Sequence, residues 1–147
     1  MKSTFALCTL LLLMIPPCFA RPISIAHSPV ILDLPESFKG DASGITFTDS
    51  LTQTKITVLK PGSNVKSAKE HLSPDFIKVK IDGTNEAYLS KIEFNTPTPG
   101  HPLLVGDLIA FTADKVWIVQ IEMPANSKSE TQHKGEELLK KICFKDR

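Results

Sequence analysis

The sequence predicts an α+β fold, in which an antiparallel sheet of about six to seven strands is sandwiched by helices in an α/β/α arrangement. Short apolar or alternating segments, each bounded by proline, glycine or polar turn residues, indicate the strands. Two segments with helical periodicity indicate the helices, and short connections between strands favour antiparallel pairing. No repeat or linker interrupts residues 21–147, so these residues are expected to form a single globular domain.

Three strands are expected in the first half of that domain. Pro35 closes the first and Pro61 stops the third, because proline cannot donate to a ladder. The strands are separated by few residues, so an antiparallel meander is expected, preceded by a loose arm and containing a polar turn. These strands are residues 30–34, 45–48 and 55–60, the arm is residues 21–28, and the turn is residues 38–40.

A short helix and a hairpin are expected next. Ser63 or Asn64 can cap the helix, which should end near Leu72. Strict alternation over residues 77–82 predicts a strand, and Asp82-Gly83 is a strong turn signal. The expected partner strand is residues 87–94, followed by a proline-marked loop at residues 95–100 that cannot be a central strand.

A long hairpin and a final helix complete the expected fold. The hairpin arms are residues 103–112 and 116–123, and the second arm is apolar on both faces near its start, which favours a central, covered strand. Ser127 and Glu130 match a capping box for a helix over residues 128–143. Gly135 within it costs about 1 kcal/mol relative to alanine, which indicates a close backbone approach or a weak first half. The expected buried stripe of this helix is Leu138, Leu139, Ile142 and Cys143.

Residues 1–20 have the pattern of a secretory signal peptide. Lys2 is their only charge, an apolar run follows, and two prolines precede small side chains, so cleavage is expected between Ala20 and Arg21. The apolar run is too short to span a bilayer stably. We therefore expect secretion across a membrane, with the bacterial periplasm as the destination.

Cysteine usage leaves one alternative open. Cys18 could carry a lipid anchor, but Pro17 occupies the place where lipidation requires a small residue, so soluble secretion is favoured. Cys143 is the only cysteine after residue 20, which excludes an internal disulfide. We expect Cys143 on the buried face of the final helix rather than as a reactive thiol or an intermolecular bridge.

Charge argues against nucleic acid as a partner. The chain has 17 basic and 16 acidic side chains, and Lys2 lies in the leader, so the charges of residues 21–147 cancel. A protein that neutralises phosphates needs a basic excess. No second apolar stretch approaches membrane-spanning length, so no transmembrane segment is expected after the leader.

No motif for catalysis, a metal or a cofactor is present. The four histidines stand outside contexts such as GxSxG, HxxxH or CxxC; they are His27, His71, His101 and His133. We therefore expect no catalytic residue, no metal site and no cofactor. The alternative is a pocket-based enzyme or metal-dependent factor that uses Tyr88, His101 and Asp107. We favour the simpler interpretation, in which His101 is a loop histidine and Asp107 a strand-turn aspartate, both in contact with water.

The order of elements over residues 28–144 has one further implication. A strand closed by Pro35 is followed by strands at residues 44–47 and 56–58, a short helix, the Asp82-Gly83 turn, and a hairpin that ends Ile121-Glu-Met-Pro124 before the last helix. This order resembles the Mog1/PsbP-like superfamily, including the bacterial DcrB and DUF1795 envelope proteins. The resemblance implies the sandwich described above and non-enzymatic association, since relatives act as photosystem subunits, a Ran-GTPase partner, secretion chaperones and envelope proteins. We thus expect a non-enzymatic domain that binds another protein or an envelope component.

Overall fold

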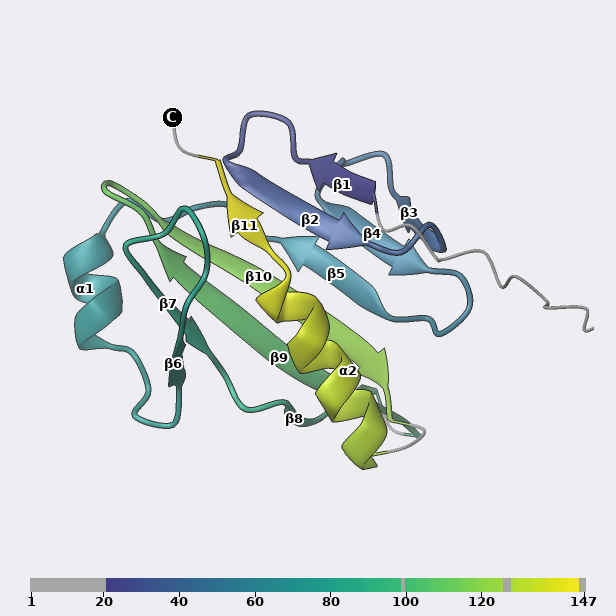
Figure 1. The fold of residues 1–147 in the computed structure, drawn as a ribbon. Coiled ribbons are helices and arrows are strands. Elements are labelled where there is room, and N and C mark those ends of the chain that lie inside the picture. Colours follow the sequence, from purple (N-terminus) through teal and green to yellow (C-terminus); the bar gives the residue numbers. More distant parts are fainter. Residues whose placement is uncertain (1–20, 99, 126–127, 146–147) are drawn as a thin grey trace, which may run out of the picture.

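The structure is a computed structural model that describes residues 21–98, 100–125 and 128–145. It contains two antiparallel sheets and two helices (Figure 1). The strands of the larger sheet are β3 (Phe38–Gly40), β4 (Thr46–Asp49), β5 (Lys55–Val58), β6 (Ile77–Val79), β7 (Glu86–Leu89), β8 (Glu93–Thr98), β9 (His101–Phe111) and β10 (Val116–Pro124). The smaller sheet contains β1 (Arg21–Ser24), β2 (Val30–Leu34) and β11 (Cys143–Phe144), and the helices are α1 (Val65–Glu70) and α2 (Lys128–Lys140).

The β9–β10 hairpin forms the centre of the larger sheet. The strand order is β3-β4-β5-β10-β9-β7-β6, and β8 pairs with the part of β9 that β7 leaves free. Every described strand pair is antiparallel, as the sequence predicts. The central position of β10 is also confirmed, because β5 and β9 flank it.

One face of the larger sheet supports the hydrophobic core. Trp117, Val119, Ile121 and Met123 alternate along β10 on this face and are at most 5% exposed. Helix α2 and the smaller sheet cover it (Figure 1), and they contribute Leu139 and Phe144 to the same core cluster. Neither described helix is long and apolar enough to cross a bilayer.

A helix covers that face of the sheet, as the expected sandwich requires, whereas the opposite face is covered at one end only. Helix α1 buries no residue of its own, and it reaches the sheet through Lys69. The Lys69 ammonium lies 3.1 Å from a Glu86 oxygen and 5.2 Å from the centre of the Phe111 ring. Val116 and Phe111 are buried on this side, while Ile118 further along β10 is half-buried. The second helix of the sandwich is therefore too short to cover the whole sheet.

The expected meander of three strands is only partly correct. Strands β4 and β5 pair as predicted, but β2 pairs with β1 and β11 in the separate smaller sheet. Val30, Leu32 and Leu34 are at most 1% exposed while the residues between them are half-buried, so this strand packs its apolar face on the core instead of joining the sheet edge. Two loop predictions are also wrong. The first residues of the expected arm form β1, which pairs with β2, and residues 38–40 form β3, which pairs with β4.

The predicted partner strand over residues 87–94 is divided into β7 and β8. Ile92 lies between them and is 1% exposed, because it leaves the sheet plane to pack into the core. A Cβ added at Gly106 or at Gly135 would approach Ile92 side-chain carbons at 2.6 and 2.9 Å, so both glycines allow close packing there. The close backbone approach predicted for Gly135 is thus confirmed. The predicted loop at residues 95–100 is instead largely strand, since β8 extends to Thr98 on an edge where proline is tolerated.

Both helices are shorter than predicted. Asn64 caps α1 as expected, since its side chain accepts a hydrogen bond from the Ser67 N–H at 3.0 Å. Helix α2 ends at Lys140, so Cys143 is not helical: it lies half-buried on β11, paired with Ile31. The pairing of residues 143–144 with β2 provides hydrogen bonds that would be lost if α2 continued to residue 143. The predicted capping box begins at Ser127, which lies outside the described residues.

Candidate functional site

The three candidate residues from the sequence lie on the same face of the sheet but do not form one pocket. His101 and Asp107 are six residues apart on β9, which separates them by about 20 Å along a strand. Tyr88 on β7 pairs with Ile109, two residues beyond Asp107. Tyr88 and Asp107 are therefore near neighbours, and His101 stands exposed at the far end of the strand.

Tyr88 is engaged with its own neighbours. Its hydroxyl donates to Glu86 at 2.8 Å, its ring packs edge-on against Phe111, and the Lys78 ammonium lies 5.8 Å from the ring centre. The hydrogen bond to Glu86 raises the pKa of Tyr88, and the same bond lowers the pKa of Glu86. This arrangement keeps the phenol protonated and the carboxylate charged, which suits a structural contact more than proton transfer.

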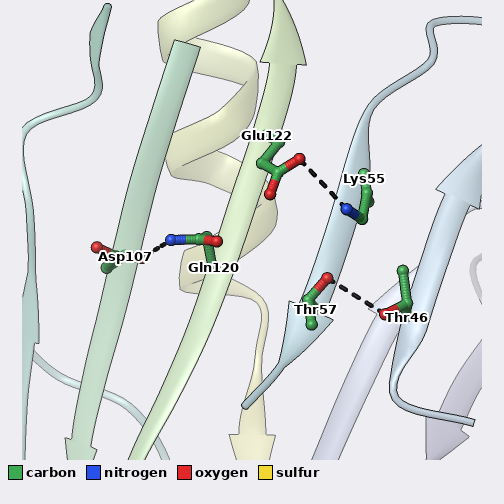
Figure 2. Close-up of polar contacts among 6 residues, drawn as sticks. All are labelled: Thr46, Lys55, Thr57, Asp107, Gln120 and Glu122. Atoms are coloured by element: carbon green, nitrogen blue, oxygen red, sulfur yellow. Dashed lines mark hydrogen bonds and ion pairs between the residues drawn. The ribbon is translucent and has the colours of Figure 1, made fainter. Parts of the chain in front are cut away.

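Asp107 is half-buried on the sheet face that helix α1 covers at one end only (Figure 2). One carboxylate oxygen accepts a hydrogen bond from the Gln120 side chain at 3.0 Å. Burial raises the pKa of Asp107, and the Gln120 hydrogen bond opposes that shift. Among the described residues, no group of three histidine, cysteine, aspartate or glutamate side chains is placed to hold a metal ion. The Asp107–Gln120 pair thus connects β9 to β10.

The same face carries two further polar contacts between strands (Figure 2). The Lys55 ammonium lies 3.4 Å from a Glu122 oxygen, joining β5 to β10, and both side chains are partly exposed. The hydroxyls of Thr46 and Thr57 share a hydrogen bond of 3.3 Å between β4 and β5. These pairs satisfy one another across the sheet, which leaves few polar groups to bind a ligand.

A more promising site lies on the other side of the molecule, beside α2. A cleft of about 600 Å³, which we call the α2 cleft, separates this helix from the loop between β4 and β5. Leu51 lies on that loop and is 82% exposed, the highest value among the exposed large apolar side chains of the described residues. The apolar part of the wall comes from Pro35, Phe38, Met123, Pro124 and Leu138.

Asp49 holds the loop that displays Leu51. This aspartate is buried, and its carboxylate accepts hydrogen bonds from the Leu51 N–H at 2.9 Å and the Thr52 hydroxyl at 2.7 Å. Burial by itself would raise the pKa of Asp49, but these hydrogen bonds outweigh it and the pKa is lowered. Gln53 adopts a left-handed conformation with φ of 58° to close the turn. Leu51 is therefore presented to solvent by a braced loop.

The charged rim of the α2 cleft comes mainly from the helix. Lys134, Lys141 and His133 line it, opposed by Glu137. Glu137 is also 3.9 Å from the Lys140 ammonium, and the Asp49 carboxylate is used by its own loop. The two lysines are thus matched in number by Glu137 and Asp49, next to an apolar wall. Sequence reasoning missed this site, although a leucine in the middle of the polar segment 49–54 was a signal for it.

Comparison with family models and with curated protein sequences gives no match. Among solved structures, a protein of Bacteroides thetaiotaomicron matches with a TM-score of 0.53 and 15% identity, over 81% of this chain and 46% of its own. The chain thus spans about half the length of that protein. The Ran-binding protein Mog1p of Saccharomyces cerevisiae matches with a TM-score of 0.46 and 12% identity, over 85% of this chain and 95% of its own. At 15% identity, the likeness to the Bacteroides protein is one of fold: a largely antiparallel sheet with helices, as expected from the sequence.

Proposed function

We propose that this chain is a secreted, non-enzymatic binding domain that holds a segment of another protein in the α2 cleft. The observation that carries the proposal is Leu51, which is 82% exposed at the edge of an apolar cleft and braced by Asp49. A large apolar side chain kept in water beside a concave apolar wall is typical of a docking surface.

The cleft indicates the chemistry of the partner segment. Its volume of about 600 Å³ accommodates one or two bulky side chains. Phe38 and Leu138 would contact such an anchor from within, and Leu51 would close over it. Lys141 on the rim forms no ion pair with another described residue, and its ammonium favours a carboxylate beside the anchor. The proposed ligand is a peptide segment with a bulky apolar residue flanked by aspartate or glutamate.

A selection from a random peptide library displayed on phage tests this assignment. Peptides enriched on the wild-type chain should share a bulky apolar residue next to an acidic one, and Leu51→Ser should weaken their binding about tenfold. Ile77→Ser is the matched control, because Ile77 is also a large apolar residue, 65% exposed, on the distant edge strand β6. No enrichment, or equal losses in both variants, would contradict the proposal.

Export is a separate part of the proposal. Strand β1 (Arg21–Ser24) follows Ala20, so cleavage there would remove none of the described strands. We expect the chain expressed with its leader in a bacterial host to be recovered from the periplasm with Arg21 as its first residue. Intact mass spectrometry tests this expectation. A retained leader, or a diacylglycerol adduct on Cys18, would contradict soluble secretion and favour the uncleaved or lipid-anchored form.

A further inference from the structure

The larger sheet carries a half-buried apolar surface on the side opposite α2, and we call it the Asp107 face. Side chains at alternate positions of a strand lie on one side of the sheet, so Val105, Asp107 and Ile109 lie together along β9. Ile118 on β10 pairs with Ile109 and completes the surface. All four side chains are half-buried, on the two central strands of the sheet. Because a solvated face of an antiparallel sheet is ordinarily polar, three aliphatic side chains at its centre indicate a surface that a partner covers.

Helix α1 shows how this side of the sheet is covered at one end (Figure 1). Phe111 lies two residues beyond Ile109 on the same side, and it is buried. The Lys69 ammonium of α1 lies 5.2 Å from the centre of the Phe111 ring and 3.1 Å from a Glu86 oxygen. One helix therefore provides both a cover for an apolar side chain and a cation for a carboxylate.

Asp107 lacks such a cation. One of its carboxylate oxygens accepts the Gln120 hydrogen bond at 3.0 Å, and no lysine, arginine or histidine among the described residues forms an ion pair with it. By contrast, Glu86 and Glu122 on the same side each pair with a lysine. Burial raises the pKa of Asp107, because its charge is held among aliphatic side chains. The exposed Glu93 on the neighbouring strand β8 adds a second carboxylate on this side, so the surface is complementary to a basic partner.

We propose that the Asp107 face binds a helix of another protein, which places a lysine or arginine on Asp107 and aliphatic side chains over Ile109 and Ile118. The spacing agrees with this occupant, because Phe111, under α1, and Asp107 are about 13 Å apart along β9. A helix with its side chains is about 10–12 Å across, so a partner helix fits beside α1 with Asp107 beneath it. Lys78 on the edge strand β6 lies over the ring of a β7 tyrosine, which leaves Asp107 to the partner's cation. The face is on the opposite side of the sheet from α2 and its cleft, and it stands independently of the function proposed there.

The probe is a phage library of a stable three-helix scaffold in which the exposed face of one helix is randomised, selected on the full chain. Enriched clones should carry a lysine or arginine with aliphatic residues three or four positions away. Asp107→Asn should weaken their binding at least about tenfold in calorimetry. Asp33→Asn is the matched control, because Asp33 is also half-buried but lies on β2 in the smaller sheet, and it should leave the affinity unchanged. A selection in which no clone depends on Asp107, or in which both variants have equal effects, overturns the proposal.

Further variants separate this face from other surfaces. Ile118→Thr should weaken the same clones about tenfold by removing apolar contact, whereas Ile31→Thr, the same change at a half-buried position on β2, should not. Leu51→Ser alters the α2 cleft and should leave these clones unaffected; clones that depend on Leu51 and not on Asp107 would count against the Asp107 face alone. The free chain should sediment as a monomer in analytical ultracentrifugation. A dimer that Asp107→Asn dissociates would assign the face to a second copy of this chain and overturn the proposed partner.

Discussion

The turn at Gly83 provides a sharp test of how the C-terminal strand is held. Gly83 has a φ of 78°, and a Cβ built there would lie 1.9 Å from the Phe144 carbonyl oxygen. Alanine in this left-handed conformation costs about 1–2 kcal/mol. The collision also forces β11 away, which loses the 2.9 Å hydrogen bond from the Phe144 N–H to Asp82, about 0.5–1.5 kcal/mol. Full exposure of the Phe144 side chain, now 5% exposed, adds about 1.5–3 kcal/mol. We expect Gly83→Ala to lower the free energy of unfolding by about 3–6 kcal/mol.

Gly44→Ala is the matched control for that measurement. Gly44 has a similar φ of 68°, but a Cβ there meets nothing within 4 Å. Its replacement should therefore cost only the conformational part, about 1–2 kcal/mol. Urea denaturation of both variants gives the difference directly. If the two losses agree within about 0.5 kcal/mol, the steric argument and the role assigned to β11 are refuted.

Three further predictions concern other parts of the sheet and its flanking helix. Asp107→Asn should raise stability at pH 7, because burial holds the pKa of Asp107 above its ordinary value of 3.8 and the charged form therefore disfavours the fold. The advantage should shrink as the pH falls through the raised folded-state pKa towards 3.8, and it should be absent below 3.8, where Asp107 is protonated in both states. A constant difference across denaturation series at several pH values would contradict this. Gly106→Ala should lower the free energy of unfolding by about 1–3 kcal/mol, because the new methyl group overpacks against Ile92. In a double-mutant cycle, Ile92→Ala should relieve part of that loss; if the two losses simply add, the contact is excluded. Asn64→Ala should destabilise helix α1 by about 0.5–1 kcal/mol, because it removes the helix cap. Hydrogen exchange should show faster exchange of amides in that helix alone, and Lys39→Ala is the control at an exposed position.

The sequence predicted the centre of the fold better than its margins. The β9–β10 hairpin was readable because its alternation of apolar residues is long and its turn is short. Whether a short apolar strand joins the larger sheet or packs on its face depends on distant partners, so the place of β2 beside β1 and β11 was not predicted. The same limit applies to Cys143, because the choice between helix and strand there is made by hydrogen bonds to β2 and to Asp82.

The candidate sites show a similar contrast. His101 and Asp107 are close in sequence, but a continuous strand separates them by about 20 Å, so proximity along the chain was a poor guide. The α2 cleft is formed by segments far apart in sequence, and Leu51 alone indicated it.

The smaller sheet has a consequence for the order of events during synthesis. Strand β2 gains its second neighbour only when residues 143–144 have been made, because β11 lies beside it. Until then, the apolar side of β2 lacks Phe144 and part of its cover. Contacts between the two ends of a chain also slow folding, since a long loop must close first. A growing chain of this design therefore lacks part of its core until residues 143–144 have been added.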